Sequence, residues 1–359
     1  MSADEMIAFT RGVPAPETFP VEQLVMCAQE VLRLEGHDIL QYGGAAGYLP
    51  LRQWIAEETQ VKVERVMMGQ GSLQLLDHTL RVLVKPGDCL FVEQPTYDRT
   101  LTLMRRIGAV LRPFDLEEGG IKIEHVESEL LRGLRPLLFY LIPDFQNPTG
   151  NVMTLEKRKR LLELAEKYGF LVVEDAPYRK LRYEGQELPS LFELNQDRVL
   201  QLSSYSKLIS PGLRVGYAIL PSELSAPLTK FAEDTYINIP HLNQAMVFQF
   251  LQKGWLDEHL ANLKRIYSER LNCLLTGLEK AFLDRAKWNH TEGGFFVGLN
   301  VNHSPGMDTL VPSARELGIV LTDGRGFFAI GGEDFIRLPF CGLTPDQITT
   351  GLERLKQLI

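Results

Sequence analysis

The sequence predicts an α/β protein with a mostly parallel sheet covered by helices, followed by a smaller α+β domain. Short and almost continuously apolar runs alternate with amphipathic stretches, which indicates strands that are covered on both faces. After about residue 245 the sequence changes to a long helical pattern and then to Gly- and Phe-rich segments. With 359 residues, 45% of them hydrophobic, the chain is large enough for two domains.

The elements of the large domain follow one another in a regular order of strand, loop, helix and strand. A helix begins at Ser72, which we expect to be its N-cap, and ends before "KPGD". A second helix from 155 ends at Gly169, directly before the next strand. The expected strands are 66–69, 89–93, 137–143, 171–175, 199–204 and 216–220.

The remaining sequence predicts the smaller domain. A long helix is expected in "WLDEHLANLKRIYSERLNCLLTGLEKAF". Strands are expected in "EGGFFVGLNV", "GRGFFAI" and "DFIRLPF", and a helix ends the chain.

Charge and composition exclude several classes of partner. The net charge of −8 disfavours nucleic acid and anionic membrane surfaces. No apolar run approaches the roughly 18 residues that a membrane span needs, and the N-terminus lacks the pattern of a signal peptide, so we expect a cytoplasmic protein. The four scattered cysteines are expected to be reduced and buried, and the spacing of the seven histidines implies no metal.

Polar residues follow each predicted strand, at the sheet edge where such folds bind ligands. They occur in "QGSLQ", where a helix start suits a phosphate, in "QPTYDR" with Tyr97, and in "DFQNPTG" with Asn147. Taken singly, each has a plain structural explanation as a capped helix, a packed tyrosine or a turn.

Two further segments suggest a specific cofactor. Asp175 and Tyr178 follow the strand 171–175, and "SSYSKLISPGLRVG" contains Ser204, Ser206, Lys207 and Arg214. An enzyme that binds pyridoxal phosphate needs a lysine for an imine, a carboxylate for the pyridine nitrogen and donors for the phosphate. These segments contain all three kinds of group.

The chain as a whole resembles the fold-type I, class I/II aminotransferases that depend on pyridoxal 5'-phosphate. The resemblance rests on "QYGGAAGYLPLR", "GSLQ", "PTY", "NPTG", "DAPY", "SYSKLISPGLRVGY" and "FIRLPF", which occur in the family's order. It implies a mostly parallel seven-stranded sheet in a large domain at 36–245, a small domain at 246–359, and residues 1–35 as an N-terminal arm and part of the small domain.

The resemblance also implies roles for individual residues. Lys207 would form the imine, Asp175 would pair with the pyridine nitrogen and Tyr97 would stack on the ring, and these three are the expected catalytic residues. Asn147 and Tyr178 would hold the phenolic oxygen, with Gln74 beside the cofactor. The phosphate would be bound by Ser72, the backbone of Leu73, Ser204, Ser206 and Arg214.

Four more positions concern the partner subunit and the substrate. Tyr42 resembles the tyrosine that reaches the phosphate of the neighbouring subunit, which implies a homodimer with active sites at its interface. Arg337 would bind the substrate α-carboxylate through its planar fork, near Asn147 and Gly12. Arg11 could reach the acidic side chain of a substrate, or it could be a solvated residue of the arm. The sequence does not decide between these two interpretations.

The resemblance is strongest to the branch of 2-aminoadipate, kynurenine, aromatic and branched-chain aminotransferases. It implies ping-pong transfer of an amino group from an L-amino acid to a 2-oxo acid, with broad specificity and 2-oxoglutarate as the acceptor. A pyridoxal-phosphate-dependent lyase, decarboxylase or cyclase could share every motif. DNA-binding regulators with a similar domain carry a winged helix before the motif that starts here at Gly12, so we expect no such role.

Overall fold

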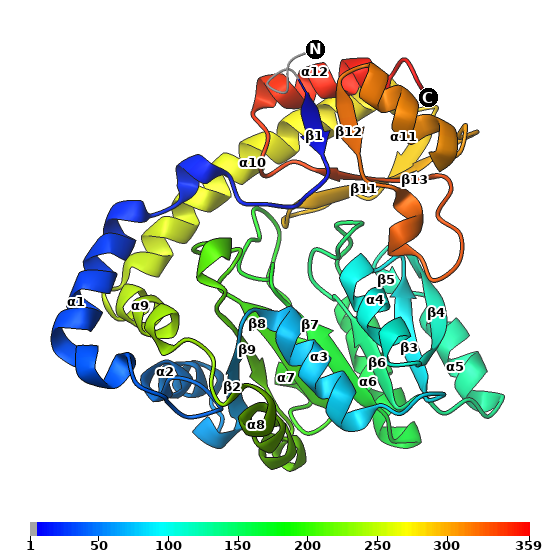
Figure 1. The fold of residues 1–359 in the computed structure, drawn as a ribbon. Coiled ribbons are helices and arrows are strands. Elements are labelled where there is room, and N and C mark those ends of the chain that lie inside the picture. Colours follow the sequence, from blue (N-terminus) through cyan, green and yellow to red (C-terminus); the bar gives the residue numbers. More distant parts are fainter. Residues whose placement is uncertain (1–5) are drawn as a thin grey trace.

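The computed structural model describes residues 6–359, and its centre is one eight-stranded sheet (Figure 1). The first five residues of the expected N-terminal arm therefore lie outside the described residues. The spatial order of the sheet is β2-β9-β8-β7-β6-β3-β4-β5. Its strands are β2 (Val66–Gly69), β3 (Cys89–Gln94), β4 (Val110–Glu117), β5 (Gly120–Ile121), β6 (Leu138–Leu141), β7 (Leu171–Asp175), β8 (Val199–Ser204) and β9 (Gly216–Ile219).

The sheet is mostly parallel, as predicted, but it has eight strands and not seven. Strands β8, β7, β6, β3 and β4 are parallel neighbours. Strand β9 runs antiparallel to both β2 and β8, and the two-residue β5 forms an antiparallel turn back onto the end of β4. The sequence analysis did not find β4, because this strand near the sheet edge has exposed residues and a proline where an apolar run was sought.

Helices cover both faces of this sheet. Alternate strand residues form two separate apolar clusters, as the two-residue period of a strand requires. One cluster joins the sheet to α3 (Ser72–Leu83), α4 (Asp98–Arg106) and α8 (Ser222–Tyr236). The other joins it to α5 (Ile123–Leu131), α6 (Leu155–Tyr168) and α7 (Leu191–Leu194).

A second part of the molecule lies beyond the carboxyl ends of the large sheet (Figure 1). It holds an antiparallel sheet of β10 (Ala286–Trp288), β11 (Phe296–Val301) and β13 (Phe335–Pro339). The N-terminal β1 (Ile7–Phe9) pairs in parallel with β12 (Ile319–Leu321), so the two ends of the sequence meet here. The helices of this part are α10 (Trp255–Phe282), α11 (Met307–Glu316) and α12 (Pro345–Leu355).

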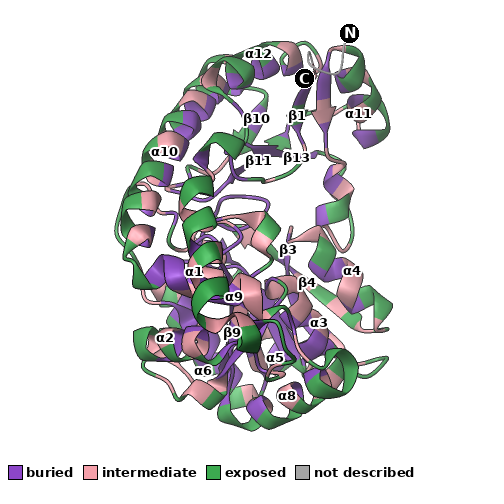
Figure 2. Ribbon diagram, turned by 60° about the vertical axis from the view of Figure 1, so that its left-hand side comes forward, coloured by how far each residue is buried: buried purple, intermediate pink, exposed green. Residues whose placement is uncertain are grey.

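Helices α1 (Val21–Ile39) and α9 (His241–Gln252) pack together along one side of the molecule, and α9 also contacts α10. Helix α2 (Leu49–Thr59) packs against α9 and against β2 of the large sheet. Short 3-10 turns are formed by Pro16–Thr18, Val63–Arg65, Pro211–Leu213 and Gly324–Phe327. Figure 2 shows the strands largely buried and the helices exposed along their outer faces.

Two local predictions need correction. Ser72 is the first residue of α3 and not its N-cap, because Gly71 occupies the cap position with φ of 86°. The segment "GRGFFAI" is not a strand: Asp323 accepts a hydrogen bond from the backbone of Arg325 and so starts a 3-10 turn. The second predicted helix is confirmed in detail, with Thr154 as its N-cap and Gly169 in the left-handed conformation at its C-terminus.

All four cysteines are free thiols, of which Cys27 and Cys341 are buried and the other two are partly exposed. Across residues 6–359, no helix is both long enough and apolar enough to cross a membrane.

Candidate active site

The carboxyl ends of five strands of the large sheet open into one cavity of about 440 Å³. The loops after β2, β3, β6, β7 and β8 all contribute to its wall, as does the arm segment around Gly12. The cavity brings together all of the predicted site residues except two. The residues that line it are Arg11, Gly12, Ser72, Leu73, Tyr97, Asn147, Asp175, Tyr178, Ser204, Ser206, Lys207, Arg214 and Arg337.

Gln74 and Tyr42 lie outside this cavity. The side-chain oxygen of Gln74 accepts a hydrogen bond from the backbone nitrogen of Gln70, at 2.6 Å, and Gln74 lines a neighbouring cavity that shares Arg214. Tyr42 precedes α2 and is 76% exposed.

Lys207 lies in the turn after β8 with its amine inside the cavity. Its Nζ donates to the backbone oxygen of Gly12, at 2.8 Å, and lies 5.6 Å from the centre of the Phe295 ring. Burial lowers the pKa of Lys207, and the nearby guanidinium groups of Arg214 and Arg337 act in the same direction. The neutral amine, which is the nucleophilic form, is thereby favoured.

Asp175 ends the buried strand β7. Its Oδ2 accepts a hydrogen bond from the hydroxyl of Tyr140, at 2.7 Å, whereas its buried Oδ1 has no partner among the described residues. Burial raises the pKa of Asp175 to about 6, although the Tyr140 hydrogen bond opposes this rise. A buried carboxylate oxygen without a partner is costly, so this atom suits a cationic ligand group such as a protonated ring nitrogen.

Tyr140 was missed by the sequence analysis. It lies within the apolar strand β6 and is fully buried, and its hydroxyl reaches Asp175 of the neighbouring strand β7. The sequence contains no local signal for that contact, because it depends on the pairing of two strands.

The loop between β6 and α6 places Asn147 at the cavity wall. The side-chain carbonyl of Asn147 accepts a hydrogen bond from Arg337 Nη1, at 3.0 Å, so a ligand would meet the NH2 group of this amide. Tyr178 follows β7 and packs edge-on against Phe296, with 5.7 Å between ring centres. Tyr97 is the N-cap residue of α4.

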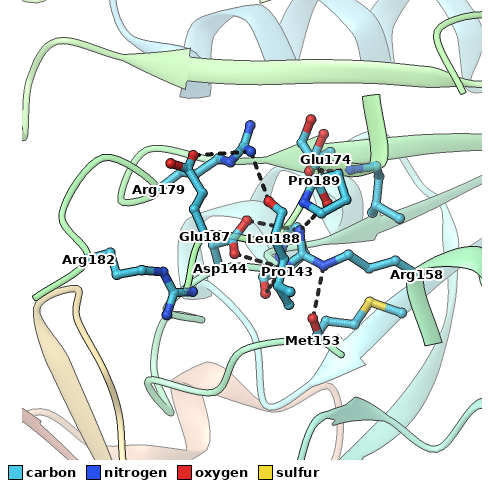
Figure 3. Close-up of polar contacts among 12 residues, drawn as sticks. Pro143, Asp144, Met153, Arg158, Glu174, Arg179, Arg182, Glu187, Leu188 and Pro189 are labelled. Carbon is cyan, nitrogen blue, oxygen red and sulfur yellow. Dashed lines mark hydrogen bonds and ion pairs between the residues drawn. The ribbon is translucent and has the colours of Figure 1, made fainter. Parts of the chain in front are cut away.

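An arginine of the adjacent helix holds both ends of the loop that carries Asn147 (Figure 3). Arg158 of α6 is fully buried, and its guanidinium makes two hydrogen bonds to the Asp144 carboxylate, at 2.7 and 3.1 Å. The same side chain donates to the backbone oxygens of Pro143 and Met153, which flank the loop. The position of Asn147 is therefore fixed from the side that faces the core.

The opposite end of the cavity has the features of a phosphate site. Arg214 Nη1 donates to the hydroxyl of Ser206, at 3.3 Å, and Nη2 donates to the backbone oxygen of Gln70, at 2.8 Å. The start of α3 adds the free backbone donors of a helix N-terminus. A Cβ on Gly71 would lie 2.3 Å from Arg214 Nη2, so only glycine allows this close approach.

Arg337 of β13 lies between two aromatic rings. Its guanidinium carbon is 4.8 Å from the centre of the Phe296 ring and 4.4 Å from that of Phe327. Its Nη2 donates to the backbone oxygen of Thr10, and its buried Nε has no partner among the described residues. Stacking of this kind fixes the plane of the fork, which suits recognition of a carboxylate.

These groups fit pyridoxal phosphate: an amine, an unpartnered carboxylate oxygen, a phosphate site and a second anion site lie in one cavity at the carboxyl ends of the strands. Fold and cavity thus define a pyridoxal-phosphate-dependent enzyme of the fold-type I class. The comparisons with known proteins identify the family. Residues 5–355 match the model of "Aminotransferase class I and II", and the chain belongs to that family. It is a pyridoxal-phosphate-dependent transaminase.

Named relatives come from the branch that the sequence motifs indicated. The chain is 35% identical to the 2-aminoadipate transaminase of Thermus thermophilus, covering 98% of this chain and 89% of that protein. It is 32% identical to aromatic-amino-acid aminotransferase 1 of Thermococcus litoralis, covering 100% and 89%. The solved α-aminoadipate aminotransferase of Thermus thermophilus, complexed with N-(5'-phosphopyridoxyl)-L-leucine, superposes with a TM-score of 0.94 at 35% identity, covering 99% of this chain and 92% of that one.

Proposed function

We propose that this enzyme moves an amino group between an L-amino acid of the 2-aminoadipate, aromatic or branched-chain type and a 2-oxo acid, with 2-oxoglutarate as acceptor. The observation that carries the proposal is the cavity itself, because Lys207, Asp175 with its unpartnered Oδ1, and the stacked Arg337 all line it. The printed names of the relatives, which include 2-aminoadipate, aromatic and kynurenine aminotransferases, support these substrate types.

In this proposal the residues divide the work by position. Arg337 binds the α-carboxylate of the substrate. The hydrogen bond from its Nη1 to Asn147 holds the guanidinium group in position. Asp175 would keep the ring nitrogen in its protonated form, and the phosphate would be bound by Arg214, Ser206, Ser204, Ser72 and the backbone of Leu73. Tyr97 would stack on the ring, and Asn147 and Tyr178 would donate to its phenolic oxygen.

The bound cofactor supplies the electron sink and carries the amino group between the two substrates. Lys207 would hold the cofactor through its Nζ. With a substrate bound, the free Nζ would act as the base that removes the proton from the substrate Cα, a role that the lowered pKa of Lys207 favours. The same site serves both substrates in turn, which gives ping-pong kinetics.

We further propose that the working form is a cytoplasmic homodimer active in amino-acid metabolism. Exposed apolar side chains are concentrated between residues 21 and 49, and Tyr42 is the most exposed of these. In such a dimer Tyr42 would complete the phosphate site of the partner.

Separate half-reactions test this function. The enzyme loaded with pyridoxal phosphate is mixed with one amino acid at a time, and the oxo acid product is quantified by mass spectrometry. We expect stoichiometric oxo acid from 2-aminoadipate, phenylalanine and leucine, and further turnover only after 2-oxoglutarate is added. Release of ammonia or carbon dioxide in place of the oxo acid would instead support the lyase or decarboxylase alternative.

A further inference from the structure

Gln146 is buried between the two loops that carry Tyr97 and Asn147. It lies directly before Asn147 in the sequence and is 1% exposed. Its side-chain Nε2 donates to the backbone oxygen of Pro95, at 2.8 Å, and to Glu93 Oε2, at 3.2 Å. Pro95 precedes Tyr97 by two residues, so this one amide group connects the loop after β3 with the loop after β6.

The amide of Gln146 uses its full hydrogen-bonding capacity in this position. Its Oε1 accepts hydrogen bonds from the backbone nitrogen and from the hydroxyl of Thr149, at 3.0 and 2.8 Å. Together with the two donated bonds, these contacts occupy both donors and both acceptor positions of the amide. Turning the amide over would bring its NH2 group against the donors of Thr149. The side chain therefore has one orientation and holds the two loops at a fixed spacing.

Glu93 supports Gln146 from the sheet. It is the last residue but one of β3 and is 2% exposed. Its Oε2 also accepts a hydrogen bond from the backbone nitrogen of Ile142, which follows β6, at 3.0 Å. Burial raises the pKa of Glu93 to about 8, so its carboxyl group keeps a proton near neutral pH. Glu93 therefore serves Gln146 mainly as a neutral acceptor.

The two loops that Gln146 connects also meet at Arg337. The backbone nitrogen of Thr96, in the loop after β3, donates to the backbone oxygen of Phe327, at 2.8 Å. The ring of Phe327 lies 4.4 Å from the guanidinium carbon of Arg337. From the other loop, Asn147 accepts a hydrogen bond from Arg337 Nη1, at 3.0 Å. The spacing of the loops therefore also affects the contacts of the arginine.

We propose that Gln146 and Glu93 are positioning residues that set the distance between the loop after β3 and the loop after β6. This spacing aligns the ring of Tyr97 with the amide of Asn147, so the inference rests on the roles proposed above for these two residues. Neither Gln146 nor Glu93 is among the described residues that line the cavity. They act only through the residues that they hold.

A second buried pair of the same kind provides a matched control. Gln201 of β8 is 7% exposed, and its Nε2 donates to Oε2 of the buried Glu174, at 2.9 Å. Glu174 in turn accepts hydrogen bonds from the backbone nitrogens of Leu191 and Phe192 at the start of α7. Gln201→Met therefore breaks a buried glutamine–glutamate hydrogen bond that supports α7 and not the two loops.

The first readout is the pH titration of the absorbance band of the bound cofactor. A donor to the phenolic oxygen favours its deprotonated form, so displacement of Asn147 should move the transition to higher pH. We expect Gln146→Met and Glu93→Met each to raise the midpoint by about one pH unit, as the loss of one hydrogen bond would. Gln201→Met should leave the midpoint in place. Glu93→Gln should also keep it, because the variant retains a neutral acceptor oxygen.

Equilibrium dialysis of pyridoxal phosphate gives a second readout that needs no turnover. Gln146→Met should weaken binding by about tenfold, because the ring of Tyr97 is no longer aligned with the cofactor. If the two positioning residues act as a unit, adding Glu93→Met to Gln146→Met should weaken binding no further. Urea titrations show whether each variant is folded. If Gln146→Met is not, the comparison of Glu93→Met with Glu93→Gln decides.

Asn147→Ala separates this inference from the proposed function. If Asn147→Ala raises the midpoint but Gln146→Met and Glu93→Met behave like Gln201→Met, the positioning role is wrong and the role of Asn147 stands. Equal shifts in Gln146→Met and Gln201→Met would show a general loosening of the fold and would also overturn the positioning role. If Asn147→Ala itself leaves the midpoint unchanged, the proposed role of Asn147 fails, and the inference that rests on it fails too.

Discussion

At the residue scale, the chemistry of the cavity depends on buried charges that the fold leaves without a cationic partner. Asp175 is the clearest case, because among residues 6–359 its carboxylate accepts a hydrogen bond only from the hydroxyl of Tyr140, and burial raises its pKa to about 6. We therefore expect the carboxyl group of Asp175 to become protonated in weakly acidic solution. Binding of a protonated ring nitrogen should weaken over the same pH range.

Replacement of Tyr140 by phenylalanine tests this contact. The Tyr140 hydroxyl favours the charged carboxylate, so its removal should raise the pKa of Asp175 further above its ordinary value. We expect about tenfold weaker binding of pyridoxal phosphate near neutral pH, with the loss of affinity beginning at a higher pH than in the original protein. Fluorescence titrations at several pH values measure this. Tyr183→Phe is the control, because its hydroxyl donates to the backbone oxygen of Gly294; equal pH profiles for the two variants would contradict the role of Tyr140.

Alanine variants of two glycines distinguish the effect of backbone strain from that of crowding at the phosphate site. Gly71 and Gly87 both have positive φ, at 86° and 94°, but only Gly71 has a near neighbour, Arg214, where a Cβ would lie. Both alanine variants should lose about 1 kcal/mol of unfolding free energy, measured in urea. Only Gly71→Ala should also weaken pyridoxal phosphate binding, by about tenfold or more, because Arg214 must move. Equal affinities in equilibrium dialysis would show that Arg214 does not bind the phosphate.

At the element scale, the sequence predicted those elements whose own residues determine them. The buried strands β3, β6, β7 and β8 read as apolar runs, and Gly169 ended α6 as expected. Because these strands were predicted correctly, the motif residues that follow them could be predicted to lie together at one edge of the sheet. Strand β4 and the contact of Tyr140 could not be predicted, because the first lies near the sheet edge and the second depends on which strand becomes its neighbour.

The loop between β6 and α6 gives a prediction at this scale. Arg158→Met leaves the buried carboxylate of Asp144 without its cation, so we expect a loss of about 3 to 5 kcal/mol in the unfolding free energy. Adding Asp144→Asn should recover part of this loss, since no charge is then buried alone. The control Arg160→Met removes the two partly exposed ion pairs that Arg160 of the same helix makes with Glu127 and Glu163, and it should cost much less in urea titrations. Similar losses for both arginines would contradict the structural role of Arg158.

At the scale of the whole molecule, the two parts meet at the cavity, with the arm segment beside both. The arm places the backbone oxygen of Gly12 on Lys207 and that of Thr10 on Arg337. If Arg337 binds the substrate carboxylate as proposed, the carboxylate competes with the backbone oxygen of Thr10 for Nη2. The helices α1, α9 and α10 lie along one side of the molecule, between the two parts (Figure 1).

The proposed dimer makes a prediction about the apolar surface between residues 21 and 49. Leu40 and Leu131 are exposed to a similar extent, 71% and 67%, but only Leu40 belongs to this surface. Sedimentation equilibrium should give twice the chain mass for the original protein and for Leu131→Asp. A charge at Leu40 should shift the equilibrium toward the monomer, because burying it without a partner is unfavourable. A monomeric original protein would contradict the dimer, and an unchanged dimer in Leu40→Asp would remove this surface from the interface.

The central claim is that Lys207 carries the cofactor, and borohydride reduction followed by peptide mass spectrometry tests it most directly. The protein is loaded with pyridoxal phosphate, reduced, digested and mapped, with Lys207→Ala treated in parallel. We predict a single phosphopyridoxyl group on the peptide that contains Lys207, and none above background in Lys207→Ala. Stoichiometric modification of a different lysine, or none in the loaded original protein, would contradict the assignment of the site.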